Sequence, residues 1–181
     1  MGMCLESNIV MGLIYNAALL LSLSIVYQVG YSLPLKWKKF APYVYGVLIG
    51  AVGLCIMTFP FTLENGVIFD TRSILLGVTA LVFGGIPVAI AAVATAVYRI
   101  IMGGSGMWMG VAVIALSAVV GLIWRKLGLM QRSKRRWLNL YALGVIIHVC
   151  MLCCTFLLPV PSSIRVLRGI AFPVMAVYPI A

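Results

Sequence analysis

Acidic side chains are nearly absent from this chain, whose 181 residues include three Asp and Glu but thirteen Lys and Arg. The three acids, Glu6, Glu64 and Asp70, form no carboxylate pair suited to acid–base chemistry. The sequence also contains no Ser–His–Asp set and no glycine-rich phosphate loop. We therefore expect neither catalytic residues nor a cofactor in these 181 residues.

Cysteines do not form the paired framework of a small extracellular domain, so we expect no disulfides. The chain has five of them: Cys4, Cys55, Cys150, Cys153 and Cys154. His148 lies close to the last three, which is a set of metal-ligating residue types. His148 and Cys150 fall on different faces of a helix, however, and cysteine is common in helices as a small apolar residue. We expect no metal site.

Apolar residues dominate the composition, at 64% against 9% charged residues. Apolar runs of about 18 residues or more recur along the chain, which is typical of a polytopic membrane protein. The first run, residues 9–33, is too long for a signal-peptide core and has no cleavage site, so we interpret it as a retained helix. The predicted partner of this surface is the lipid bilayer.

Basic residues are concentrated in two short segments that contain no acid. They are Lys36, Lys38 and Lys39 in the first segment, and Arg125, Lys126, Arg132, Lys134, Arg135 and Arg136 in the second. Such segments between apolar runs mark the cytoplasmic side of a membrane protein, and they do not indicate nucleic-acid binding. The resulting topology places the N-terminus outside the cytoplasm, with the chain crossing the plasma membrane several times.

The predicted fold is an all-α membrane helix bundle of six to seven segments. We expect helices at 9–33, 43–61, 73–83, 87–102, 107–124 and 137–158, and a shorter one at 170–181. Residues 62–66 are expected to form a turn on the outer side. Twelve residues span only about 18 Å as a helix, so the last segment looks truncated and the chain is expected to be a fragment. Gly46, Gly50 and Gly53 predict a close helix contact, because small residues let helices approach in membranes.

Residues 73–102 are apolar, and both flanks must lie on the same side of the membrane. Gly84, Gly85 and Pro87 interrupt the middle of this stretch. We predict a broken hairpin with a buried tip at Gly84–Pro87, either re-entrant or made of two short helices. One continuous tilted helix is the alternative, but it would put residues 125–136 on the outer side.

The hairpin would bring two arginines to a similar depth near the outer side. Arg72 lies 12 residues before Gly84, and Arg99 lies 12 residues after Pro87. Arginine binds carboxylate and phosphate groups through two parallel hydrogen bonds, so the pair predicts a site for a small anion. Both side chains could instead extend to lipid headgroups.

Neighbouring residues would complete this anion site. We expect Asp70 and Thr71 to cap the first arm of the hairpin or to orient Arg72. Backbone amides of Gly103, Gly104 and Ser105 would line the pocket beside Arg99.

The run DTRSILLGVTALVFGGIPVAIAAVATAVYRIIMGGSG, residues 70–106, resembles the signature of the LytS-type five-transmembrane receptor domain of bacterial sensor proteins. That signature has Asp or Asn two residues before Arg, a Gly-Gly-Pro-like break, a Tyr-Arg pair and then Gly-Gly. The matching residues here are Asp70, Arg72, Gly84, Gly85, Pro87, Tyr98, Arg99, Gly103 and Gly104. Ile86 departs from the family's tighter break. The resemblance covers about residues 43–181.

The resemblance implies a sensory input module that binds a small extracytoplasmic carboxylate, such as pyruvate. Family members couple this module to a cytoplasmic histidine kinase or diguanylate cyclase, and some are linked to cell-wall remodelling. The implied partners are a response regulator, reached through an output domain beyond residue 181, and a second copy in a homodimer. The alternative function is a substrate-binding component of a small-molecule transporter, since such subunits are also compact bundles of about six helices.

Overall fold

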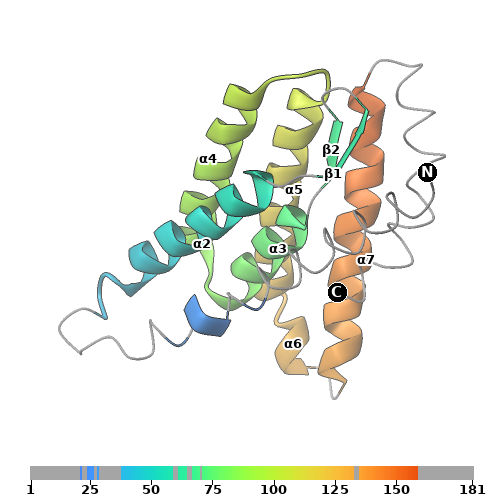
Figure 1. Ribbon diagram of the computed structural model, residues 1–181. Helices are drawn as coiled ribbons and strands as arrows, with labels where there is room; N and C mark the ends of the chain where they lie inside the picture. The colour runs from blue at the N-terminus through green and yellow to red at the C-terminus, as the bar shows by residue number, and fades with distance from the viewer. Residues whose placement is uncertain are drawn as a thin grey trace, which may run out of the picture.

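The computed structural model describes residues 21, 24–26, 28, 38–58, 61–64, 67–69, 71–132 and 135–158. Its main elements are the helices α2 (Ala41–Thr58), α3 (Arg72–Val82), α4 (Gly85–Met102), α5 (Met107–Lys126), α6 (Leu129–Arg132) and α7 (Arg136–Cys154) (Figure 1). A 3-10 turn, η2 (Thr155–Leu157), continues α7. The predicted helix bundle is confirmed, whereas most of the expected helix at 9–33 and all of that at 170–181 lie outside the described residues.

Two short antiparallel strands, β1 (Phe61–Glu64) and β2 (Val67–Phe69), connect α2 to α3. Phe61 pairs with Phe69, and the register shifts between Thr62 and Glu64. The sequence predicted only a turn at 62–66.

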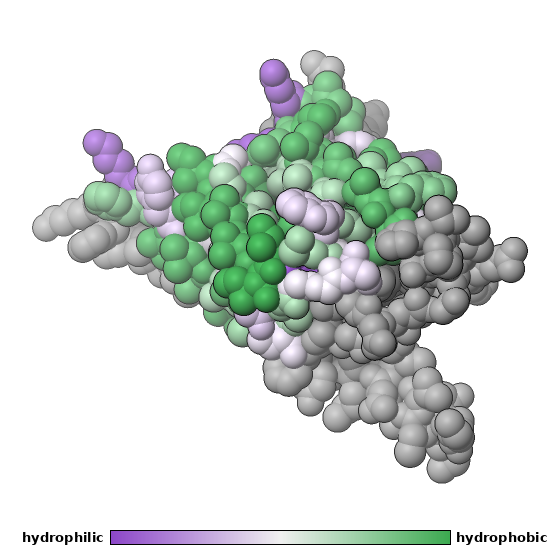
Figure 2. Space-filling model, turned by 90° about the horizontal axis from the view of Figure 1, so that it is seen from above, coloured by the Kyte–Doolittle hydropathy of each residue, from purple (hydrophilic) through white to green (hydrophobic). Residues whose placement is uncertain are grey.

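The bundle exposes large apolar side chains on its outside and buries two arginines inside. Ile101 is 75% exposed and Trp108 is 67% exposed, whereas Arg72 is 4% exposed and Arg99 is 1% exposed. Figure 2 shows a surface that is mostly hydrophobic over the described helices. Four helices, α2, α4, α5 and α7 with its η2 extension, are long and apolar enough to cross a membrane. This arrangement suits lipid as the surrounding solvent, and the chain is a multi-pass membrane protein.

Helices α2 and α4 pack side by side in parallel through the predicted glycine contact. A methyl group added at Gly46 would lie 2.8 Å from the Ile90 side chain, and one at Gly53 would lie 2.7 Å from Thr95 Cγ2. Gly50 faces the Ala94 side chain in the same interface. Because the residue numbers rise together, the two helices run in the same direction, and the expected role of these glycines is confirmed.

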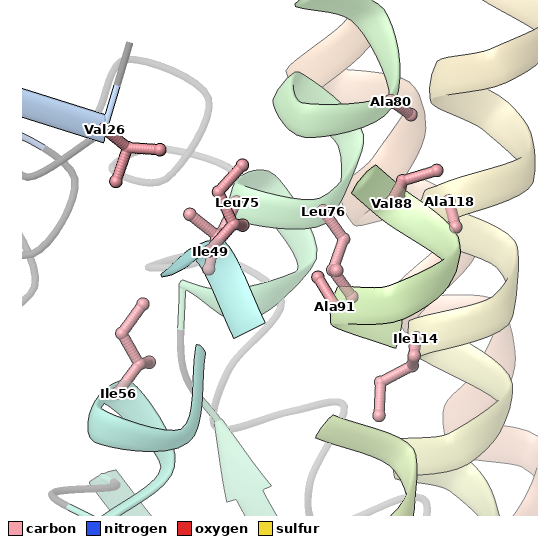
Figure 3. Packing of buried hydrophobic residues seen from close by; sticks show 10 residues of the cluster. All are labelled: Val26, Ile49, Ile56, Leu75, Leu76, Ala80, Val88, Ala91, Ile114 and Ala118. Carbon is pink, nitrogen blue, oxygen red and sulfur yellow. The ribbon is translucent and has the colours of Figure 1, made fainter. Parts of the chain in front are cut away.

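Helices α3 and α5 form a second parallel pair, which the sequence did not reveal. A methyl group at Gly121 would meet the backbone carbonyl of Gly77 and would lie 2.7 Å from Ala80 Cβ. Gly77 also faces Ile147 of α7. Figure 3 shows the apolar core between α2, α3, α4 and α5, where Leu76, Ala91 and Ile114 are fully or almost fully buried.

The break between α3 and α4 lies at the end of the bundle that carries the basic residues. Gly84 has φ of 92°, a conformation that favours glycine. Arg125, at the end of α5, donates from Nη1 to the carbonyls of Leu81 at 3.0 Å and Val82 at 2.8 Å. The tip of the hairpin between α3 and α4 therefore lies level with the C-terminal end of α5. We call this end the basic end, defined by Lys38, Lys39, Arg125, Lys126, Arg135 and Arg136.

The prediction that the whole tip is buried is partly wrong. Gly84 and Pro87 are buried, but Gly85 is exposed and Ile86 is 47% exposed. The reason is that the tip reaches the basic end and does not stop among the helices. The hairpin is long enough to reach that end because the 18 residues of α4 extend about 27 Å.

Candidate ligand site

Arg99 lies in the last turn of α4, at the end of the bundle opposite to the basic end. Its Nη1 donates to the carbonyl of Gly103 at 2.8 Å, beyond the C-terminus of α4. Its side chain crosses α5 at Gly110, where an added methyl group would lie 2.6 Å from Nε and 3.1 Å from Cδ. Gly110 therefore makes the room that Arg99 occupies between two helices. Sequence reasoning missed Gly110, although its position in the first turn of a helix that follows Gly103–Gly104 was visible.

Arg72 is the first residue of α3 and is buried to a similar degree. Its Nη1 donates to the sulfur of Met57 at 2.9 Å, in the last turn of α2. A thioether is a weak, polarisable acceptor. The ends of α2 and α3 thus meet at this arginine, and Met57 is a neighbour that the sequence did not identify.

The two arginines lie at a similar level along the bundle. A methyl group added at Gly53 of α2 would lie 2.7 Å from Thr95 Cγ2 and 3.6 Å from Leu75 Cδ2. Thr95 comes one turn before Arg99, and Leu75 comes about one turn after Arg72. Since α3 and α4 run in opposite directions, both arginines stand about one turn beyond Gly53 toward the same end. This geometry supports the similar depth that their equal spacing from the break predicted.

The cap predicted at Thr71 is wrong in its detail. Thr71 does occupy the N-cap position of α3, and its carbonyl accepts the N–H of Leu75 at 3.0 Å. Its side chain makes no capping hydrogen bond to α3. Thr71 is buried, at 2% exposure. Asp70 lies outside the described residues.

The amide predicted to line the pocket at Gly103 has another role. The N–H of Gly103 donates to the carbonyls of Arg99 at 3.2 Å and Ile100 at 3.1 Å, which closes the C-terminus of α4. Gly103 contributes its carbonyl to Arg99 instead. Gly104 and Ser105 are exposed in the turn that leads to α5. Two consecutive glycines with positive φ, 65° and 87°, make this turn tight enough to return the chain beside Arg99.

His148 and the three cysteines after it all lie on α7. Nδ1 of His148 lies 2.7 Å from the carbonyl of Gly144 in the same helix. Cys150 and Cys153 have a Cys-x-x-Cys spacing, and both are free. In the part of the chain that the structure describes, no three His, Cys, Asp or Glu residues gather as a metal site.

The described helices form a multi-pass membrane bundle with apolar outer faces. Two arginines are buried at one end of it. The model of the family described as 5TMR of 5TMR-LYT matches residues 32–181, and the chain belongs to this family. It is therefore a transmembrane sensory module of signalling proteins, and the resemblance inferred from the sequence is confirmed. No curated protein and no solved structure matches the chain.

Proposed function

We propose that this module senses a small carboxylate, such as pyruvate, that binds from the extracytoplasmic side between Arg72 and Arg99. The observation that carries the proposal is the burial of both guanidinium groups at one level, at 4% and 1% exposure. Ionisable groups inside a membrane bundle are costly, and they are usually retained for binding or transfer of charge.

The orientation of the bundle supports access from outside. Basic segments mark the cytoplasmic side, so the basic end faces the cytoplasm and the arginines lie toward the opposite surface. By the same rule we propose that the N-terminus lies outside, and membership in a family of bacterial sensor proteins favours the bacterial plasma membrane. A ligand of the extracytoplasmic space would then reach the arginines without crossing the apolar core.

The chemistry of the arginines supports a carboxylate. Two buried guanidinium groups at one level favour an anionic ligand, and the planar guanidinium matches the two oxygens of a carboxylate.

Signal output follows from the family. We propose that the module acts on a cytoplasmic histidine kinase or diguanylate cyclase domain, with a response regulator as partner in the first case, and that it works as a homodimer. The carboxylate would act by binding one arrangement of the helices more tightly than the other. Membership in a sensory family favours this function over the substrate-binding subunit of a transporter.

The test is pyruvate binding to purified protein in a lipid environment. A charge-assisted hydrogen bond contributes about 1.5–3 kcal/mol, so Arg72→Ala and Arg99→Ala should each weaken binding by roughly tenfold to more than a hundredfold. Arg72→Lys should restore only part of the affinity, because an ammonium group lacks the planar fork. Arg136→Ala, an exposed arginine of the basic end, is the matched control and should bind as the unchanged protein does.

Equal affinity in all of these variants would contradict the proposed site. The two arginines would then be explained by contacts with lipid headgroups and helix ends.

A further inference from the structure

The basic end carries more positive charge than the chain can neutralise. All six cations that define it are exposed: Lys38, Lys39, Arg125, Lys126, Arg135 and Arg136. The sequence contains no Asp or Glu after Asp70. The one acid that the structure describes, Glu64, lies in β1 at the opposite end of the bundle (Figure 1). The basic end therefore depends on anions from outside the chain.

These cations fall into two groups with different surroundings. Lys38 and Lys39 lie in the turn before α2. Arg135 and Arg136 begin α7, where α5, α6 and α7 all contact one another. Asn139 of α7 donates from Nδ2 to the backbone carbonyl of Leu129 in α6 at 2.7 Å, which fixes the start of α7 against its neighbour. Only the second group stands on a framework that holds it in place.

Trp124, near the end of α5, adds a neutral donor to this region. Its Nε1 is buried and has no hydrogen-bond partner among the described residues. An indole N–H can only donate, and it usually finds an acceptor when it is buried. The residue as a whole is partly exposed, so it borders the surface of the bundle. An acceptor from outside the chain would satisfy this group.

The packing of α5 against α7 shows where Trp124 faces. Val113 of α5 and Met151 of α7 belong to one apolar cluster. Trp124 comes 11 residues after Val113, and Leu140 comes 11 residues before Met151. Because 11 residues make about three turns and the two helices run in opposite directions, Trp124 faces α7 near Leu140, about one turn inward from Arg136.

Two aromatic residues mark the level of the membrane surface here. Trp137 is 67% exposed and Tyr141 is 44% exposed, one turn apart on the outer side of α7. Trp and Tyr are enriched at the level of the lipid headgroups. Arg135 and Arg136 therefore lie among the headgroups, and Trp124 lies just below them, at the depth of the phosphate and ester oxygens of a phospholipid.

We propose that the start of α7 and the end of α5 bind the headgroup of an anionic phospholipid of the cytoplasmic leaflet. Arg135 and Arg136 pair with its phosphate, and Trp124 Nε1 donates to an oxygen of the same lipid. Charge complementarity supports this occupant, because the surface is basic and that leaflet is anionic. The exposed Leu140 beside the donors offers contact to an acyl chain, which a free phosphate ion lacks.

The test is a titration of the purified full chain in a mild detergent with phosphatidylglycerol and with phosphatidylcholine, read by native mass spectrometry. Phosphatidylglycerol should bind more tightly. The double variant Arg135→Gln with Arg136→Gln should weaken its binding by about tenfold or more. Lys38→Gln with Lys39→Gln is the matched control, since it removes the same charge from the same end, and it should change the affinity by less than about twofold.

A second pair of variants tests the indole. Trp124→Phe keeps an aromatic ring and removes the N–H, so phosphatidylglycerol should bind about threefold to tenfold more weakly. Trp137→Phe, which changes an exposed indole of the same end, should leave the affinity within about twofold.

Four results would overturn the proposal. Equal affinity for both lipids would exclude a site for anionic headgroups. Equal losses in the two double variants would show diffuse attraction to the basic end. An unchanged affinity in Trp124→Phe would remove the indole from the site. Displacement of the lipid by an equal concentration of inorganic phosphate would identify the free ion as the occupant.

Discussion

The two ends of the bundle each use an arginine to close the C-terminus of a helix. Arg125 donates to the Leu81 and Val82 carbonyls at the end of α3, and Arg99 donates to the Gly103 carbonyl at the end of α4. Both bonds are favourable, because helix C-termini attract positive charge. Arg125 is exposed, however, whereas Arg99 is 1% exposed. Capping accounts for an exposed arginine, whereas an arginine buried in a membrane bundle is a candidate for ligand binding.

Glycines of α5 show the same difference between the ends. Gly121, toward the basic end, lets the backbone of α3 approach at Gly77. Gly110, toward the opposite end, makes room for a charged side chain. One end of α5 is therefore shaped for helix packing and the other for holding a polar group.

Labelling of the two ends should give the largest effect, because it is close to all or none. In a background without the native cysteines, we expect Ser105→Cys to react with an impermeant maleimide from the extracytoplasmic side, and Gly85→Cys to react from the cytoplasmic side. Both positions are exposed. Labelling of position 105 only from the cytoplasm would invert the bundle, and absence of labelling at position 85 from either side would place the tip inside the bilayer.

A methyl group near the basic end should destabilise the bundle strongly. Gly121→Ala would press against the Gly77 carbonyl and Ala80 of α3, where backbone has to move. Overpacking of this kind costs typically about 1–3 kcal/mol in the free energy of unfolding. Thermal or denaturant unfolding in lipid or detergent measures it. Gly85→Ala is the control, since an added methyl group there meets nothing within 4 Å, and its stability should stay within about 0.5 kcal/mol.

A methyl group at the opposite end should affect binding more than stability. Gly110→Ala would displace the Arg99 side chain, which is flexible and can move without shifting a helix. We expect pyruvate to bind about tenfold more weakly, equal to about 1.4 kcal/mol, because the guanidinium loses its place. A binding titration beside an unfolding curve measures both. Loss of stability as large as in Gly121→Ala, with binding unchanged, would remove the distinction between the two ends.

Hydrophobic runs and charge made most of the fold predictable. Glycine and proline at Gly84–Pro87 located the break, and Gly46, Gly50 and Gly53 located one helix interface, because both signals are local in sequence. The α3–α5 interface was missed because Gly77 and Gly121 are 44 residues apart and each lies alone in an apolar run. The short strands at 61–69 were missed because they depend on how the chain returns from α2 to α3.

Site residues were predictable to the extent that they carry charge. Arg72 and Arg99 stand out because charge is rare in such a chain. Gly110 and Met57 became visible only through packing, and the role of the Gly103 amide was mistaken because a helix C-terminus competes for the same N–H.

The link between Arg125 and the hairpin tip gives the bundle a mechanical property. Helix α4 has 18 residues and begins directly after Gly84, which has φ of 92°. The Arg125 side chain ties the end of α3 to the end of α5, so it fixes the turn that leads into α4. Over the roughly 27 Å length of α4, a tilt of about 5° about that turn would displace its far end by about 2 Å. A stimulus that draws Arg99 inward by that amount would press its side chain against α5 at Gly110.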